Sequence, residues 1–123
     1  MSERPIRLEV TGTCARVPLQ APLWILEGKA RYADAHPDED IFIVHVLNPP
    51  HLKRPILRVL PGKGLLDRYP VEVKRPYGVA ERYVVVPVTA PEIMREEVFL
   101  RWLEDRTRGQ RSLQQTLLPL AFD

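Results

Sequence analysis

The sequence predicts an α+β domain: an antiparallel sheet, or a partly open small β-barrel, of about five to seven strands, then one C-terminal helix and an extended tail. Three observations predict this class. Short alternating or β-branched runs recur about every ten residues, turns rich in proline and glycine separate them, and a helical pattern begins only near residue 89. At 123 residues the chain can bury one hydrophobic core. We expect a single domain over residues 1–109 and a tail over residues 110–123.

Alternation of apolar and polar residues predicts the first strands. The run IRLEV, residues 6–10, alternates with a period of two, which is typical of a half-buried strand. The run LWILEGKARYA, residues 23–33, places Trp24 and Leu26 on the same side. We expect it to be a strand that bends at Gly28.

The remaining strands are predicted by β-branched content between turns. The apolar run IFIVHVL, residues 41–47, predicts a central strand that is buried on both faces. Three further strands are expected over residues 55–60, 71–75 and 79–88. The sequence Pro-Gly-Lys-Gly at residues 61–64 lacks the spacing of a phosphate-binding loop and predicts a tight turn.

One helix is predicted over residues 89–109. Thr89 and Glu92 have the spacing of a capping box, and Gly109 can end the helix in the left-handed conformation. Ile93 and Leu100 fall on the other side of the helix from its main apolar stripe, so we expect it to be covered on two sides. The stripe consists of Met94, Val98, Phe99, Trp102 and Leu103.

Residues suited to catalysis or metal binding are few. The spacing of His36, His45 and His51 matches no local metal signature, and His45 is expected in the core with a backbone partner. The acidic run DAHPDED, residues 34–40, lacks the glycine and the closing glutamate of a calcium loop and predicts a solvated turn. An enzyme centred on His36 and this loop is one hypothesis for the function, and it ranks behind the two given at the end of this section. We expect no catalytic residue, metal or cofactor.

The composition indicates the cellular compartment in which the protein is expected. No apolar run approaches the length of about 20 residues that spans a bilayer, and no secretory signal follows the start. Cys14 is the only cysteine, so an internal disulfide is excluded; we expect it to be a small buried residue in a cytoplasmic protein. A single asparagine, Asn48, beside 13 prolines resembles the composition of thermophile proteins, although a GC-rich genome would produce a similar bias.

A basic segment lies in the second half of the chain. Residues 51–82 contain eight Lys or Arg against three Asp or Glu, and Tyr69, Tyr77 and the adjoining Tyr83 lie near these cations in the sequence. Cations neutralise phosphates and aromatic rings stack on bases, so a basic sheet face that binds DNA or RNA is predicted. The alternative is that these are the outward-facing charges of an ordinary sheet. The predicted nucleic-acid-binding residues are Lys53, Arg54, Arg58, Lys63, Arg68, Lys74, Arg75 and Arg82.

The tail carries the one sequence motif. Residues 115–120 read Q-T-L-L-P-L. This resembles the short motif, roughly Q-x-x-L-x-[LF], by which bacterial replication and repair proteins bind the sliding clamp of DNA polymerase, although Thr116 stands where Leu is common. The resemblance implies that Gln115 is the polar anchor, that Leu118 and Leu120 fill apolar pockets, and that Pro119 keeps the segment extended. A second register would use Gln114, Leu117 and Leu118. The predicted partner-binding residues are Gln115, Leu117, Leu118, Pro119, Leu120 and Phe122.

Two functions remain open at this point. The first is a non-catalytic accessory protein of DNA replication or repair, whose tail docks on the sliding clamp and whose basic sheet face contacts nucleic acid. The second is an interaction module whose tail packs on its own core or exchanges with a second copy in a homodimer. Neither needs a membrane.

Overall fold

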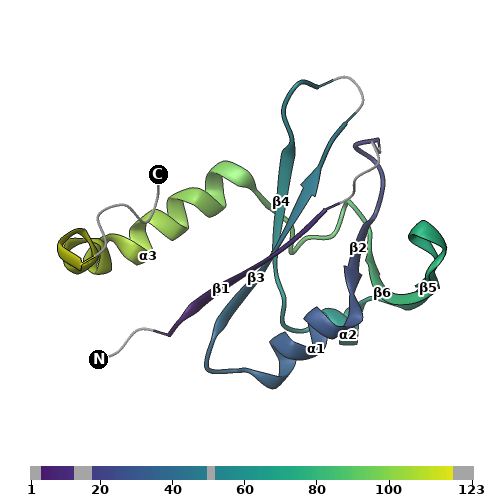
Figure 1. The fold of residues 1–123 in the computed structure, drawn as a ribbon, viewed down its shortest axis with the longest axis horizontal. Coiled ribbons are helices and arrows are strands. Elements are labelled where there is room, and N and C mark those ends of the chain that lie inside the picture. Colours follow the sequence, from purple (N-terminus) through teal and green to yellow (C-terminus); the bar gives the residue numbers. More distant parts are fainter. Residues whose placement is uncertain (1–3, 13–17, 50–51, 118–123) are drawn as a thin grey trace.

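The computed structural model describes residues 4–12, 18–49 and 52–117, and of residues 77 and 109–117 it describes the backbone. In this part of the chain, seven strands form two sheets, one of four strands and one of three. The four-stranded sheet lies at the centre of Figure 1, between the three-stranded sheet and the last helix, α3. The predicted α+β class is confirmed, and the two sheets do not close into a barrel.

The four-stranded sheet has the strand order β1-β3-β4-β7. It consists of β1 (Ile6–Gly12), β3 (Asp40–Leu47), β4 (Ile56–Pro61) and the short β7 (Met94–Arg95). β1 runs parallel to β3, whereas β4 is antiparallel to both β3 and β7. The strand predicted to be central, β3, is confirmed as central, since β1 and β4 pair with its two edges. Its β-branched residues suit a strand that is covered on both faces.

Side chains alternate across this sheet and define two faces. The inner face packs against the three-stranded sheet, and the outer face packs against α3. Members of the inner face are Ile43, His45, Arg58 and Leu60, and members of the outer face are Leu8, Val10, Phe42, Val44 and Val59. Because the inner face also carries His45 and Arg58, two polar side chains lie within the interior.

The three-stranded sheet has the order β2-β6-β5 and is antiparallel throughout. Its strands are β2 (Leu23–Leu26), β6 (Glu81–Val86) and β5 (Val71–Lys74), and the 3₁₀ turn Pro76–Gly78 connects β5 to β6. The core between the sheets is built from side chains with no exposed surface: Leu23, Ile25, Ile43, Leu60, Leu65, Val84 and Val86. Each such aliphatic side chain contributes about 1.5–3 kcal/mol on burial, so these residues hold the sheets together.

The segment predicted as one bent strand, residues 23–33, is divided between a strand and a helix. Only Leu23–Leu26 is extended, and α1 follows directly at Glu27–Ala35. The prediction was wrong because Ala30 and Ala33, three residues apart, both turn into the core, which a helix allows and a strand does not. The expected turn after β4 is present and leads into one helical turn, α2 (Leu65–Arg68), where Gly64 adopts a left-handed φ of 82°.

The C-terminal helix, α3 (Glu96–Leu117), differs from the prediction at both ends. It begins after Thr89 and Glu92, because turns at residues 87–93 and the pairing of β7 with β4 occupy the expected first turns. It also continues past Gly109. One glycine inside a helix costs about 1 kcal/mol, and the arginine, glutamine and leucine residues after it favour the helix.

Candidate functional site

The residues with the clamp-like motif belong to the end of α3 and to the segment after it. Gln115 and Leu117 lie in the last turn of α3, where the backbone is helical. Leu118, Pro119, Leu120 and Phe122 lie outside the described residues, as do Cys14 and His51. The tail expected from residue 110 is therefore helical as far as residue 117.

An aromatic cluster attaches the first half of α3 to the outer face. The ring of Phe42 lies 5.1 Å from that of Phe99 and 4.9 Å from that of Trp102, measured between centroids. Leu103 packs on the same cluster. Tilted aromatic contacts at this spacing add about 0.5–1.5 kcal/mol each to the burial of the rings. In the expected stripe, Val98 is instead exposed, and Leu100 on the other side is exposed as well.

An ion pair between α3 and β3 lies beyond the aromatic cluster along the helix. The guanidinium of Arg106 donates a 2.7 Å hydrogen bond to Oδ2 of Asp40 and another of 2.7 Å to the carbonyl of Arg4. Along α3, the contacts described with the body of the protein end at Arg106, whose guanidinium also lies 5.6 Å from the ring centroid of Trp102. Figure 1 shows α3 running away from both sheets toward its C-terminal end.

The eight predicted nucleic-acid-binding residues do not gather on one sheet face. Lys53 and Arg54 precede β4 on the hairpin that connects it to β3, and Arg58 points into the interior. The others lie near α2 (Lys63, Arg68) or on and beside the three-stranded sheet (Lys74, Arg75, Arg82). Their closeness in sequence does not become one basic surface, because the chain passes from one sheet to the other between residues 61 and 71.

Most of these cations are engaged within the protein. Arg82 donates hydrogen bonds of 2.9 and 3.1 Å to the carboxylate of Glu27, and Arg68 pairs with Glu92. Lys74 pairs with Glu72 at 3.0 Å, and its ammonium lies 5.1 Å from the ring centroid of Trp24. Lys63 donates to the carbonyls of Pro37 and Glu39. Among the described side chains, ion-pair partners are absent for Lys53, Arg54, Arg58 and Arg75.

Two carboxylates show the electrostatic effect of these pairs. The hydrogen bonds from Arg82 lower the pKa of Glu27, and Arg31 contributes in the same direction. The hydrogen bond from Tyr69 lowers the pKa of Glu92, and the Arg68 guanidinium adds to it. Both carboxylates therefore stay ionised near neutral pH and neutralise cations that would otherwise face a nucleic acid.

The acidic run at residues 34–40 makes contacts within the fold. Asp34 accepts a 2.9 Å hydrogen bond from the backbone N–H of Gly64, and Asp40 pairs with Arg106. His36 stacks on Tyr32 with 3.7 Å between ring centroids, and its Nδ1 lies 2.8 Å from the Tyr32 carbonyl oxygen. The loop therefore joins α1, α2 and α3, and it is more than the solvated turn that the sequence predicts. Within the described ranges no group of three or more His, Cys, Asp or Glu is arranged to hold a metal ion.

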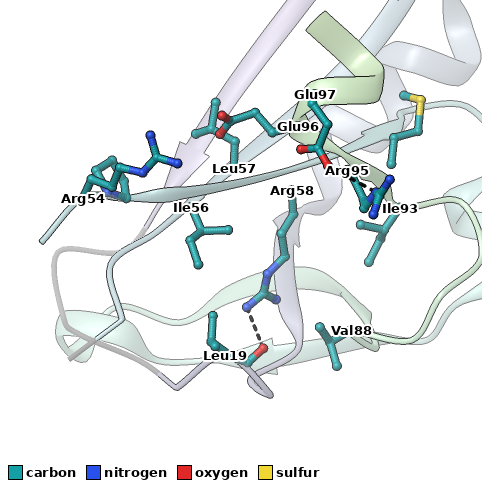
Figure 2. Close-up of a pocket in the computed structure, with 12 residues that line it drawn as sticks. Leu19, Arg54, Ile56, Leu57, Arg58, Val88, Ile93, Arg95, Glu96 and Glu97 are labelled. Atoms are coloured by element: carbon teal, nitrogen blue, oxygen red, sulfur yellow. Dashed lines mark hydrogen bonds and ion pairs between the residues drawn. The ribbon is translucent and has the colours of Figure 1, made fainter. Parts of the chain in front are cut away.

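A cavity of about 570 Å³ lies at the edge of β4 (Figure 2). β7 pairs with β4 only at Arg58 and Val59, so the first two residues of β4 stand beside the hollow. Its walls come from the segment before β2, from β4, and from the chain between β6 and the start of α3. They include the aliphatic side chains of Leu19, Ile56, Leu57, Val88, Ile93 and Met94.

Arg58 is the buried charge of this cavity. It is 6% exposed, and its two terminal nitrogens donate 2.9 Å hydrogen bonds to the carbonyls of Ala21 and Leu19. Burial lowers the pKa of Arg58. Its neighbour across the strands is His45, 3% exposed, where burial and then the Arg58 charge lower the pKa to about 4. The expected core position of His45 is confirmed, but its Nδ1 has no hydrogen-bond partner among the described residues.

The sequence predicted Arg54 and Arg58 as nucleic-acid contacts and Ile93 as part of a helix, and it did not connect them with one cavity. Leu19 and Val88 belong to no pattern in the sequence, and they meet Arg58 only because the two sheets pack together. One signal was present: Arg58 lies in the middle of the apolar run PILRVL, where alternation directs it to the same face as Ile56 and Leu60.

None of the helices in the described part of the chain is long and apolar enough to cross a membrane.

Comparisons with known proteins do not identify a family for this chain. No protein-family model, no curated protein and no solved structure matches the chain.

Proposed function

We propose that the protein is a non-catalytic accessory protein of DNA replication or repair that docks on the sliding clamp through residues 115–120. The course of α3 is the observation that supports this best. Phe99, Trp102 and Arg106 hold the first half of the helix on the body. The segment that resembles clamp ligands is thus joined to the body by a helix that leads away from it.

Docking as an extended peptide requires the last turn of α3, which contains Gln115, to unwind. Terminal turns of helices open with free energies that start near zero, so unwinding one turn is a small cost beside the burial of two leucines. Leu118 and Leu120 would each supply about 2 kcal/mol on full burial in the clamp. Pro119 restricts the unbound backbone and so reduces the entropy that is lost on binding.

Nucleic-acid contact is the weaker part of the proposal. Lys53, Arg54 and Arg75 are the exposed members of the predicted set without a described ion pair. Charge on the hairpin before β4 would therefore supply the main contact with phosphates. Replacing these three residues with Ala should weaken DNA binding and reduce its salt dependence.

The docking test uses purified clamp and the full chain. Wild-type protein should bind, and the double variant Gln115→Ala, Leu118→Ala should lose at least tenfold in affinity, measured by surface plasmon resonance. Leu113→Ala is the matched control, because Leu113 belongs to neither register of the motif. Comparing Gln114→Ala with Gln115→Ala identifies the register. Equal binding by the double variant and by wild type would disprove the docking.

The exposed apolar strip on the outer face favours one alternative. Leu8 and Val10 lie beside β3 on the face that α3 occupies, and both are exposed among the described residues. A tail that packs on this strip, in its own chain or in a second copy, would use the same leucines. Deleting residues 113–123 should then lower the melting temperature or change the oligomeric mass. The clamp proposal expects neither change.

A further inference from the structure

The cavity beside β4 combines a size and a lining that suit a small ligand. Its volume of about 570 Å³ falls within the range of roughly 300–1,000 Å³ that ligand pockets occupy. Its wall contains both aliphatic and charged side chains. Of the charged side chains only Arg58 is buried, and an aliphatic wall beside one buried cation selects a ligand with an apolar body and a single polar head.

The charged groups divide between the two sides of β4. Figure 2 shows Ile56 and Arg58 pointing to the side where Leu19 and Val88 lie, whereas the carboxylates of Glu96 and Glu97 lie on the opposite side of the strand. Glu97 is also paired with Arg95 at 3.3 Å. The wall on the side of Arg58 is therefore mainly aliphatic, and Arg95, the neighbour of Arg58 on β7, is exposed and has its charge paired with Glu97.

Arg58 is the group that specifies the head of the ligand. A guanidinium carries five N–H donors, and the carbonyls of Leu19 and Ala21 accept only two described hydrogen bonds. Both acceptors are neutral. Of the two neighbours across the strands, His45 is neutral at pH 7, and the exposed Arg95 has its charge paired with Glu97. A buried cation surrounded by neutral groups is stabilised by an anion that brings both charge and acceptor oxygens.

We propose that this cavity binds an aliphatic carboxylate, with its carboxylate on Arg58 and its chain against Ile56, Val88 and Ile93. A carboxylate matches the planar fork of one guanidinium, and its single charge balances a single buried cation. The site does not involve the tail, so its test is independent of clamp docking.

Octanoate is the probe, titrated into the full chain and followed by calorimetry and by amide chemical shifts. We expect saturable binding of one octanoate per chain. Octanol has the same chain without the charge, octylammonium has the opposite charge, and acetate has the head without the chain. Each should bind at least tenfold more weakly. Octanol binding as tightly as octanoate, or octanoate binding without saturation, would overturn the proposal.

Two matched variants test the location without removing Arg58, which also holds residues 19 and 21 in place. Val88→Glu adds a negative charge to the cavity wall at a position that is 36% exposed, so the fold should tolerate it. It should weaken octanoate binding at least tenfold. Val79→Glu adds the same charge at a position that is 60% exposed and outside the cavity lining, and should leave binding unchanged. Equal affinities for the two variants would show that octanoate binds elsewhere.

Discussion

The two faces of the four-stranded sheet are built from the same strands but are covered differently. On the inner face, Ile43 and Leu60 have no exposed surface, because the three-stranded sheet and α1 pack over them. On the outer face, α3 covers Val44 and Val59, while Leu8 and Val10 on β1 stay 41% and 62% exposed. The apolar alternation of β1 is as regular as that of a strand with a covered face.

This difference in how the two faces are covered indicates which of them contributes more to the stability of the fold. Burial on the inner face accounts for the cohesion of the two sheets, and its polar members, His45 and Arg58, are placed where they cost free energy unless they are compensated. The outer face is only partly used by the fold, and α3 leaves it toward the motif. Substitutions in the core between the sheets should therefore change stability more than those at the uncovered end of the outer face.

The largest expected effect comes from truncating one leucine on each face. Leu60→Ala should lower the free energy of unfolding by about 2–5 kcal/mol, because it leaves a cavity in the core between the sheets. Leu8→Ala makes the same chemical change at the exposed end of the outer face and should cost at most about 1 kcal/mol. Urea denaturation of both variants measures the difference. Similar losses would show that the two faces contribute alike.

A second test uses the pH dependence of the inner face. The pKa of His45 is about 4 in the folded protein and near 6.5 in the unfolded chain. Between these values the unfolded chain binds a proton that the folded protein lacks, so stability falls as the pH is lowered from 6.5 to 4. One pKa unit corresponds to about 1.4 kcal/mol, so the loss should reach about 3 kcal/mol.

His45→Gln is the control for this test, since glutamine does not titrate. Its unfolding free energy should be flatter than that of wild type between pH 6.5 and 4, in urea titrations at closely spaced pH values. Glu27 and Glu92, whose pKa values are lowered, begin to lose their contribution below about pH 5. They do so in wild type and variant alike, so the difference between the two proteins still reports on His45. If variant and wild type change in parallel, His45 is not the group responsible.

The strands that enclose the core between the two sheets were largely predictable from the sequence, because they are short β-branched runs between prolines. β3 and β6 show this most clearly, since IFIVHVL and RYVVV offer no helical period. The segment after Leu26 was not predictable by the same rule. In a window of a few residues, alternation in LEGKARYA suits a strand, and the helix is selected by Ala30 and Ala33 packing against the core.

The sequence did not predict the start of α3 or the cavity, and the reason is related. The spacing of Thr89 and Glu92 is a valid local signal for a helix start, but the pairing of Met94 and Arg95 with β4 overrides it. The cavity walls come from residues 19, 54–58, 88 and 93–97, which no local pattern connects. Their meeting is a product of tertiary packing, so the ligand site could be found only in the structure.

The smallest expected effect tests how closely the inner side is packed, with two glycines. A Cβ added at Gly62, next to β4, would lie 2.9 Å from the Cβ of Ala33 and 3.3 Å from Cγ2 of Ile41. Gly62→Ala should therefore destabilise the protein by about 1–3 kcal/mol through overpacking. A Cβ added at Gly28, in the first turn of α1, has nothing within 4 Å.

Gly28→Ala is thus the matched control with the opposite expected sign. Alanine reduces the backbone entropy of the unfolded chain and favours the helix, so this variant should gain up to about 1 kcal/mol. Thermal melts of both variants, with urea denaturation for the free energies, measure the two shifts. A neutral Gly62→Ala would mean that α1 can move away from β4 without cost. The inner side would then be as adaptable as the outer face, and the contrast in packing between the two faces would no longer hold.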